Sequence, residues 1–361
     1  MSHSPRDLAS LAAVHASRDD VELLHGLVAI ESLSGGEGEA VTYLCDAMAQ
    51  RGFRVERDRV GNAIGSVGCG ERHIVLLGHI DTVPGHIPVR IKDDVLHGRG
   101  AVDAKGPLAT FIAAATIVAD RAKVKITVVG AVGEETLGSP GAVAVAAWPA
   151  PDWCVIGEPS GWDALCLGYR GTLSLSYRLE QDSRHTAGPG QAVGERAIAY
   201  WNAVAAEAAR RNVGVVGEFA SLGVSLRAFN TSGDGLAERA ELSIGLRLPP
   251  NLDVAGLIAT LRECTGEADV RIEGCQEGYR TEKRSPLTAP FLREIRRNGG
   301  TPRFTLKLGT SDMTVVGPRW GCPIVAYGPG DASLDHTPQE RVSLDDYGRA
   351  IEILSGVLLA L

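Results

Sequence analysis

Histidines and acidic residues stand where the sequence predicts that buried strands end. His79 and Asp81 occur in GHIDTVP at 78–84, directly after the apolar run HIVLLGHI. Residues two positions apart on a strand point to the same face. Asp81 could therefore hold the His79 imidazole in the tautomer that binds a metal. The segment predicts a metal ligand with a supporting carboxylate, and a solvated turn is the alternative.

Three further acidic motifs follow the same plan. Asp103 lies in GRGAVDAKGP, a glycine-rich turn before a helix, where it could cap that helix or bridge two cations. Glu134 and Glu135 follow the strand-like KITVVGAV, and Glu158 follows WCVIG. Adjacent carboxylates at a buried strand end are unfavourable unless they are paired or bind a metal. One of the Glu134–Glu135 pair could bind metal while the other acts as a base.

A second histidine, His336, lies far along the chain in DASLDHTPQE at 331–340. A lone histidine is more often structural, but this one joins four separate segments with ligand-type residues. Mixed histidine and carboxylate ligation suits zinc or cobalt and leaves room for water. Two bridged cations would lower the pKa of a shared water and stabilise a tetrahedral oxyanion. The set predicts metal-dependent hydrolysis.

The predicted elements explain how these motifs could meet. Apolar strands at 73–80, 125–132 and 153–157 alternate with helices at 106–120 and 140–147. This alternation predicts an α/β domain with a mainly parallel sheet covered on both faces. In such sheets, sites gather at the carboxyl ends of the strands.

The pattern changes after about Gly168. TLSLSYRLE at 172–180 alternates with period two, and the segments that follow predict the order βαββαβ, a ferredoxin-like arrangement. We therefore expect a catalytic metal-binding domain formed by 1–168 and 280–361, with a second domain inserted at 169–279.

Composition limits the classes of partner. The formal net charge of -8 argues against general nucleic-acid binding. The seven cysteines form no CxxC pair and are expected to be reduced thiols. No segment has the apolar length of a transmembrane helix, and the N-terminus lacks a signal-peptide pattern. We expect a cytoplasmic protein without nucleic-acid or membrane partners.

Six motifs in this order resemble one family. GHIDTVP, GRGAVDAKGP, GEETLGS, GEPS, GTSDM and the late histidine are similar to the di-zinc amidohydrolases and peptidases that include acetylornithine deacetylase and succinyl-diaminopimelate desuccinylase. The resemblance implies a zinc-peptidase-like catalytic domain, an inserted lid/dimerisation domain, a homodimer, and two Zn²⁺ ions for which Co²⁺ could substitute. The ligands that it implies are His79, Asp103, Glu135, Glu158 and His336.

The same resemblance implies a role for each ligand and its neighbours. His79 and Glu158 would hold one ion, Glu135 and His336 the other, and Asp103 would bridge them. Two further residues complete this centre, with Glu134 as the general base and Asp81 as the support of the first histidine.

Other matching segments imply substrate contacts. His185 in RHTAGP would reach the active site of the neighbouring subunit, and Arg247 in RLPPN would hold a substrate carboxylate. Asn230, expected in a loop at a strand end, would contact the oxyanion or substrate. GTSDM would line the substrate pocket through Gly309, Thr310 and Ser311.

The short link between the first two metal motifs, GHIPVRIKDDVLHGRGAVDAKGP, is most similar to one branch of the family. That branch releases lysine or ornithine from a small acidic amino-group carrier protein. The amino acid is attached through its α-amino group to the side-chain carboxyl of the carrier's terminal Glu. An acidic tail needs cationic partners. The candidates are Arg90, Lys92, Arg99, Arg170, Arg184, Arg280 and Lys283, whereas Lys105 is expected to be internal.

Three alternatives stay open. The substrate could be acetylornithine or succinyl-diaminopimelate, or the protein could be a dipeptidase or aminopeptidase of the same fold. A non-catalytic metal-binding or dimerising module is the third, but Glu134 argues against it because a storage site needs no additional base.

Overall fold

The computed structural model describes residues 15–185 and 187–361, whose backbone divides into two compact units. The first unit extends to Gly168 and also contains Thr281–Leu306 and Ser311–Leu361. The second contains Tyr169–Arg280 and Lys307–Thr310. Within the described part of the chain, no helix is both long enough and apolar enough to cross a bilayer.

The segment Lys307–Thr310 departs from the expected division, because the sequence analysis placed it in the catalytic domain. Its contacts explain the difference. The Arg170 N–H donates to the Lys307 carbonyl at 3.4 Å, and the Arg247 guanidinium donates to the Thr310 hydroxyl at 2.9 Å. A local pattern of four residues contains no signal for such long-range pairing.

The first unit is built on a mixed sheet with a parallel centre, in the order β1-β2-β6-β3-β7-β15-β8. Strand β3 lies parallel to β6 and β7, and β7 lies parallel to β15, whereas the β1, β2 and β8 pairings are antiparallel. The parallel centre is the part that the strand–helix alternation predicts. The strands are β1 (Arg54–Arg57), β2 (Ala63–Val67), β3 (Arg72–His79), β6 (Val124–Ala131), β7 (Trp153–Gly157), β8 (Ala164–Tyr169), β14 (Arg303–Lys307) and β15 (Ile324–Ala326).

Helices cover this sheet, and α3 is the central one because α1, α9 and the strands β3, β6 and β7 pack against it. Leu108 and Phe111 of α3 are completely buried in the resulting core. The helices are α1 (Arg18–Ala29), α2 (Gly38–Gln50), α3 (Lys105–Val118), α4 (Pro140–Val145), α7 (Thr288–Arg297), α8 (Met313–Trp320) and α9 (Leu344–Ala360), with a short 3₁₀ turn at Ala332–Leu334. Helix α8, which has Pro318 in its last turn, is not predicted by the sequence pattern.

A small antiparallel sheet also belongs to the first unit, in the order β16-β5-β4. Its strands are β4 (Arg90–Lys92), β5 (Val95–His97) and β16 (Arg341–Ser343). Leu96 and Val342 turn inward into the core. Strands of three residues are too short to produce a recognisable period, which is why the sequence did not predict them.

The second unit has the element order β9-α5-β10-β11-α6-β12, the βαββαβ order that the sequence predicts. Its antiparallel strands lie in the order β10-β11-β9-β12, a ferredoxin-like arrangement. Leu173, Leu175 and Tyr177 alternate along β9 and point into a core shared with the two helices. The elements are β9 (Gly171–Asp182), α5 (Val193–Arg211), β10 (Gly223–Gly233), β11 (Ala237–Leu248), α6 (Val254–Glu263), β12 (Asp269–Gln276) and β13 (Tyr279–Arg280), with a 3₁₀ turn at Glu218–Ala220.

Candidate metal centre

Three parallel strands bring the acidic motifs of the first unit to one edge of its sheet. Strand β3 ends at His79, which pairs with Ala131 at the end of β6, and Gly78 pairs with Gly157 at the end of β7. Glu134, Glu135 and Glu158 follow these ends, so their backbone positions are fixed beside His79. This is the edge at which parallel sheets form their sites.

The ligand-type atoms gather around one carboxylate. Asp103 Oδ1 lies 3.0 Å from His79 Nε2, and Asp103 Oδ2 lies 3.0 Å from His336 Nε2. Glu135 Oε1 is 2.9 Å from His336 Nε2, and Glu158 Oε1 is 3.8 Å from His79 Nε2. One ligand atom each from His79, Asp103 and Glu135 lies within 4.8 Å of the other two. The two Asp103 oxygens each face a different histidine, as a carboxylate that bridges two cations requires.

Asp81 supports this cluster in two ways, of which the sequence analysis foresaw one. Its backbone carbonyl lies 3.0 Å from His79 Nδ1, and its Oδ1 lies 3.5 Å from the same nitrogen. Its carboxylate also accepts the Glu134 and Glu135 N–H groups at 3.0 Å and the Ser34 hydroxyl at 2.7 Å. Burial opposes ionisation of Asp81, but the hydrogen bond and charge of His79, followed by the hydrogen bonds from Ser34 and Glu135, lower its pKa overall. Asp81 therefore positions both the histidine and the turn that carries the two glutamates.

Glu340 is a supporting residue that the sequence analysis did not identify. It is 1% exposed, and its Oε1 accepts the N–H groups of Val102 at 3.0 Å and Asp103 at 3.1 Å. Its Oε2 lies 2.7 Å from Arg99 Nη1. The Glu340–Arg99 ion pair therefore fixes the backbone at Asp103. Only this long-range contact, and no local sequence pattern, identifies Glu340 as a supporting residue.

The electrostatics of the cluster favour cations. Burial, reinforced by neighbouring carboxylates, raises the pKa values of Glu134 and Glu158 well above their usual range. Hydrogen bonds that the imidazole donates to the Asp103 and Glu135 carboxylates raise the pKa of His336 to about 10. His336 also has a φ of +60°, a left-handed conformation that concentrates at functional sites. So many buried carboxylates are unfavourable unless positive charge compensates them, and mixed nitrogen and oxygen donors suit a divalent transition metal.

Asp312 is a further buried acid close to this charge cluster. It is 2% exposed, and neither carboxylate oxygen has a hydrogen-bond partner among the described residues. Burial raises its pKa to about 7, and the charges of His79 and Asp81 also act on it. The GTSDM motif predicted a role in the substrate pocket for the three residues before Asp312, but no role for Asp312 itself.

The substrate residues expected from sequence divide between the two units. Arg247 contacts Thr310 in the second unit through the hydrogen bond described above. Gly309, which precedes Thr310 in sequence, is half-buried. Ser311 is buried in the first unit, where its hydroxyl accepts the Met313 N–H at 3.2 Å. The structure therefore brings Arg247 and Thr310 together directly.

The expected loop position of Asn230 is wrong, because this residue lies inside strand β10. It pairs with Glu241, whereas Arg247 pairs with Gly223. The seven positions between Gly223 and Asn230 correspond to about 23 Å along a strand. The strand simply continues past the polar residues that suggested a loop, because its pairing with β11 persists to Gly233.

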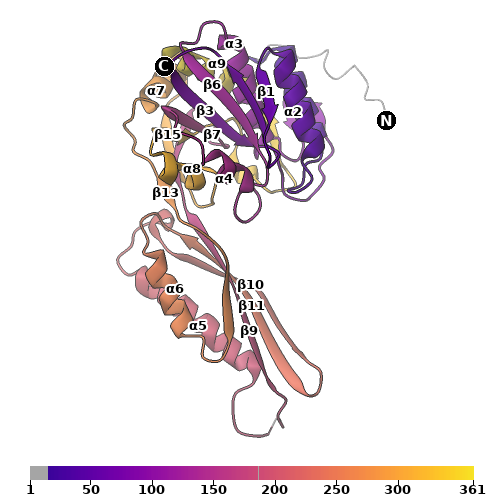
Figure 1. The fold of residues 1–361 in the computed structure, drawn as a ribbon, viewed down its shortest axis with the longest axis vertical. Helices are drawn as coiled ribbons and strands as arrows, with labels where there is room; N and C mark the ends of the chain where they lie inside the picture. The colour runs from indigo at the N-terminus through magenta and orange to yellow at the C-terminus, as the bar shows by residue number, and fades with distance from the viewer. Residues whose placement is uncertain (1–14, 186) are drawn as a thin grey trace. The chain divides into compact units, whose positions relative to one another are not determined.

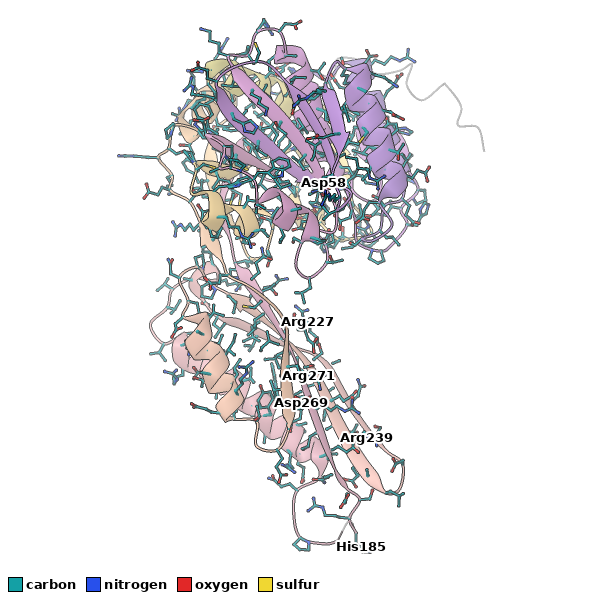
Figure 2. All side chains as sticks on the ribbon, viewed as in Figure 1. Asp58, His185, Arg227, Arg239, Asp269 and Arg271 are labelled. Carbon is teal, nitrogen blue, oxygen red and sulfur yellow. The ribbon has the colours of Figure 1, made fainter. Side chains whose placement is uncertain are left out.

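His185 lies in the second unit, in the loop that follows β9 (Figure 2). Its side chain is exposed, and its Nδ1 accepts the Ala187 N–H at 3.2 Å.

Several of the cations proposed for an acidic substrate are engaged within the fold. Arg99 forms the ion pair with Glu340, and the Arg170 Nε donates to the Leu308 carbonyl at 3.1 Å. Arg184 donates to the Pro189 carbonyl at 3.3 Å. Lys105 is internal, as expected, because it is 1% exposed and its Nζ donates to the Ile30 carbonyl at 2.6 Å.

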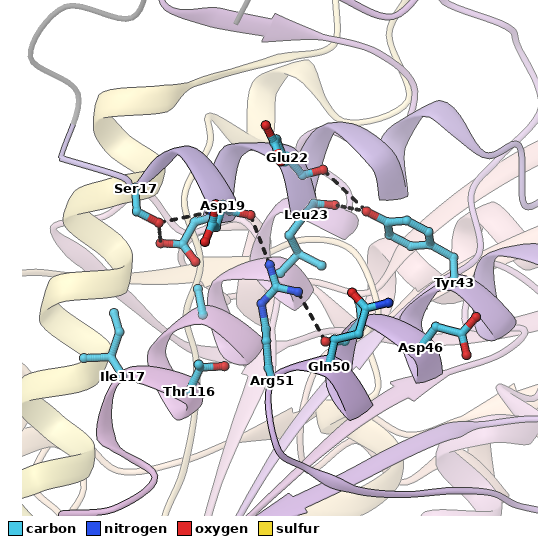
Figure 3. A pocket seen from close by; sticks show the side chains of 13 residues that line it. Ser17, Asp19, Glu22, Leu23, Tyr43, Asp46, Gln50, Arg51, Thr116 and Ile117 are labelled. Atoms are coloured by element: carbon cyan, nitrogen blue, oxygen red, sulfur yellow. Dashed lines mark hydrogen bonds between the residues drawn. The ribbon is translucent and has the colours of Figure 1, made fainter.

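A hollow of about 700 Å³ in the first unit lies among α1, α2 and α3 rather than at the metal cluster (Figure 3). The Arg51 guanidinium donates to the Asp19 carbonyl at 3.0 Å, and the Tyr43 hydroxyl donates to the Leu23 carbonyl at 3.3 Å. These bonds join α2 to α1, so the polar groups of this hollow have a structural role.

Comparison with known proteins agrees with the interpretation of this cluster as a candidate metal centre. Residues 75–360 match the family model "Peptidase family M20/M25/M40". The chain is 44% identical to the [LysW]-lysine hydrolase of Deinococcus radiodurans, over 94% of this chain and 96% of the relative. It is 40% identical to a putative [LysW]-lysine/[LysW]-ornithine hydrolase of Thermococcus kodakarensis, over 95% of this chain and 92% of the relative.

Solved structures share the fold. An M20 family metallo-carboxypeptidase from Sulfolobus solfataricus superposes with a TM-score of 0.79 at 17% identity, covering 94% of this chain and 98% of that one. Aminopeptidase PepT from Bacillus cereus superposes with a TM-score of 0.75 at 19% identity, covering 95% and 98%. The family expected from the sequence motifs is confirmed. The chain is a hydrolase that belongs to peptidase family M20/M25/M40.

Proposed function

We propose that this protein hydrolyses the amide bond that joins lysine or ornithine to the carrier protein LysW, releasing the free amino acid for biosynthesis. The observation that carries the proposal is the 44% identity, over almost the whole of both chains, to a [LysW]-lysine hydrolase. The relative from Saccharolobus solfataricus, named for both lysine and ornithine conjugates, supports keeping both amino acids in the proposal.

We infer that the centre binds two Zn²⁺ ions, with Co²⁺ as a substitute. His79 and Glu158 would hold one ion, Glu135 and His336 the other, and Asp103 would contact both. The contacts of the two Asp103 oxygens with different histidines support this division. When bound, the ions supply Lewis-acid chemistry, polarising the amide carbonyl and making a nearby water more acidic.

Glu134 is the proposed general base. It stands next to Glu135 but is not needed as a ligand, and its N–H is anchored on Asp81. Its carboxylate would take a proton from the attacking water and deliver it to the α-amino nitrogen of the departing lysine. Asp81 would keep both the base and the His79 ring in place during these transfers.

The second unit is proposed to act as a lid/dimerisation domain. Arg247, held by Thr310, would bind the α-carboxylate of the departing amino acid, and Gly309 and Ser311 would line the pocket beside it. His185 would enter the active site of the second subunit of a homodimer, which its exposed position in a loop permits. Asn230 remains a proposed substrate contact, now from strand β10.

We place the reaction in the cytoplasm, without nucleic-acid or membrane partners. All seven cysteines are free thiols, which supports a reducing compartment.

The decisive experiment compares substrates. Metal-loaded enzyme is incubated with a LysW–lysine conjugate, a LysW–ornithine conjugate, acetylornithine and succinyl-diaminopimelate, and the release of free amino acid is followed by chromatography. A carrier conjugate should have the highest kcat/KM. Faster cleavage of either small acyl substrate would overturn the carrier assignment but leave metal-dependent hydrolysis standing.

A further inference from the structure

The outer face of the small sheet β4-β5-β16 carries a row of basic side chains. Arg90 pairs with His97, and His97 pairs with Arg341, so the three stand in register across the three strands. Lys92 is two positions after Arg90 and therefore points to the same face. The alternate positions, such as Leu96, point into the core. We call Arg90, Lys92, His97 and Arg341 the basic face.

The positive charges of the basic face form no ion pair within the described part of the chain. Among the described residues, Arg90, Lys92 and Arg341 form no ion pair, and Arg341 donates to the Gln339 carbonyl at 3.0 Å. All three side chains are exposed. Burial lowers the pKa of His97, and the charges of Arg90, Arg341 and Lys92 lower it further. The field at this surface is thus positive, although Asp93 and Asp94 form the adjacent hairpin turn.

Two arginines on the sheet of the second unit, Arg239 and Arg271, are different (Figure 2). Arg239 lies 2.8 Å from Glu180, and Arg271 lies 2.7 Å from Asp269. Such pairs leave little net charge to attract a partner. Neighbouring basic side chains on a sheet of this chain can thus be paired with acids, as Arg239 and Arg271 are.

The basic face is continuous in sequence with the metal centre. His97 precedes Asp103 by six positions, and Arg341 follows His336 by five. The Gly98 N–H donates to the Glu340 carbonyl at 3.3 Å, and the Glu340 side chain accepts the Asp103 N–H. Even fully extended, six residues span no more than about 20 Å. The His97 backbone therefore lies within about 20 Å of the Asp103 backbone, on the side of the proposed metal centre.

We propose that the basic face docks an acidic segment of the carrier protein, no more than about six residues before the glutamate to which the amino acid is attached. The proposal rests on the proposed function and names the surface that would recognise its protein substrate. The length follows from the reach of an extended chain over about 20 Å, at roughly 3.3 to 3.6 Å per residue.

Charge gives the physical reason for such a surface. This chain has a net charge of -8, so an acidic partner is repelled at long range. A local cationic row beside the active site offsets that repulsion, directs the tail to the correct edge, and fixes its register.

The test is a pair of matched charge reversals. Arg90→Glu/Lys92→Glu changes an exposed arginine and lysine two positions apart on β4. Arg121→Glu/Lys123→Glu changes an equally spaced exposed pair before β6, at the opposite end of that strand from Glu134, and alters net charge equally. Both variants are assayed with the LysW–lysine conjugate and with a small surrogate, lysine joined through its α-amino group to the side-chain carboxyl of N-acetylglutamate.

The basic-face variant should have a KM for the conjugate raised about 10-fold or more, with kcat on the small surrogate unchanged. The control variant should match the wild type on both. Adding Arg341→Glu should raise the KM further. The neutral variant Arg90→Gln/Lys92→Gln should show a smaller rise, and it provides the test if the reversal impairs folding. Equal KM values for the basic-face and control variants would overturn the proposal.

A reciprocal change identifies the acidic segment. Replacing the acidic residues of the carrier tail by their amides should raise the wild-type KM. With that altered carrier, the KM of the basic-face variant should be little higher than that of the wild type. Additive losses would show that the two surfaces do not meet and would overturn the proposal. If wild-type enzyme cleaves no carrier conjugate but cleaves a small acyl substrate, the proposed function fails. If wild-type enzyme cleaves the conjugate but these substitutions leave the KM for the conjugate unchanged, only the docking proposal fails.

Discussion

Replacing Glu340 by alanine should destabilise the first unit more than any typical surface change. The substitution removes the acceptor for the Val102 and Asp103 N–H groups and leaves Arg99, with a side chain 14% exposed, without a counter-charge. Breaking a buried ion pair from one side costs about 3–5 kcal/mol, and each unsatisfied buried N–H adds about 1–3 kcal/mol where water cannot replace the carboxylate. We therefore expect the free energy of unfolding to fall by at least about 3 kcal/mol.

Urea denaturation of metal-free protein, followed by circular dichroism, measures this loss. Glu22→Ala is the control, because Glu22 pairs with Arg18 where their side chains are 46% and 66% exposed. Such a pair contributes less than about 1 kcal/mol.

Metal affinity gives a second readout for Glu340. Because this residue fixes the backbone of Asp103, Glu340→Ala should weaken zinc binding by about 10- to 100-fold, as outer-shell substitutions do. Competition with a chromophoric chelator measures the change. Glu340→Gln, which keeps an acceptor oxygen but not the charge, should lose less of both stability and affinity. An alanine variant within about 1 kcal/mol of wild type, with unchanged zinc affinity, would refute this account of the support.

Three further predictions concern the centre and the proposed dimer. Chelation should abolish hydrolysis, and zinc or cobalt should restore it; elemental analysis of active enzyme without a transition metal would contradict the proposed cofactor. Glu134→Gln should lower kcat by about 10²- to 10⁴-fold with metal content retained, and near-normal turnover would show that another group is the base. His185→Ala and Glu134→Gln subunits, each inactive alone, should regain activity when mixed; no recovery despite demonstrated subunit exchange would argue against action across a dimer.

Burial of Asp312 gives a prediction about pH. Because its pKa is raised to about 7 in the fold, the folded state binds this proton more tightly than the unfolded chain. Its contribution to the stability of metal-free protein should therefore fall as pH rises from about 4 to about 7. Asp312→Asn should remove that fall, whereas the exposed control Asp120→Asn should keep it. Unfolding free energies measured between pH 5 and pH 8 would contradict this reasoning if both variants showed the same slope as the wild type.

Much of the candidate centre could be predicted from local sequence. The strand before His79 is a continuous apolar run, and similar runs precede Glu134 and Glu158. Buried parallel strands must carry such runs, and their carboxyl ends must lie together once the strands pair. Periodicity therefore predicts both the sheet and the edge at which these acids meet. The period-two alternation of β9 similarly predicts the second unit.

The sequence could not supply pairings between residues far apart along the chain. From sequence alone, Arg99 is equivalent to the other basic residues expected to bind an acidic substrate. Its ion pair with Glu340 excludes it from that set. Asn230 lies among polar residues that suggest a loop, but pairing with β11 makes them a strand. Three-residue strands such as β4 have no measurable period, and only their partners define them.

The sequence by itself determined the family, the residue types of the candidate centre and the order of elements, because each depends on residue identity and short-range spacing. The tertiary structure decided how the side chains are used. It turned Asp81 toward the Glu134–Glu135 turn as well as toward His79, and it set the two Asp103 oxygens against different histidines. It also left Arg90 and Lys92 on one face, without an ion pair to any described residue, while burying Lys105. Hydrogen bonds and ion pairs act over a few ångströms between groups that can be hundreds of positions apart, so only the folded chain can select among them.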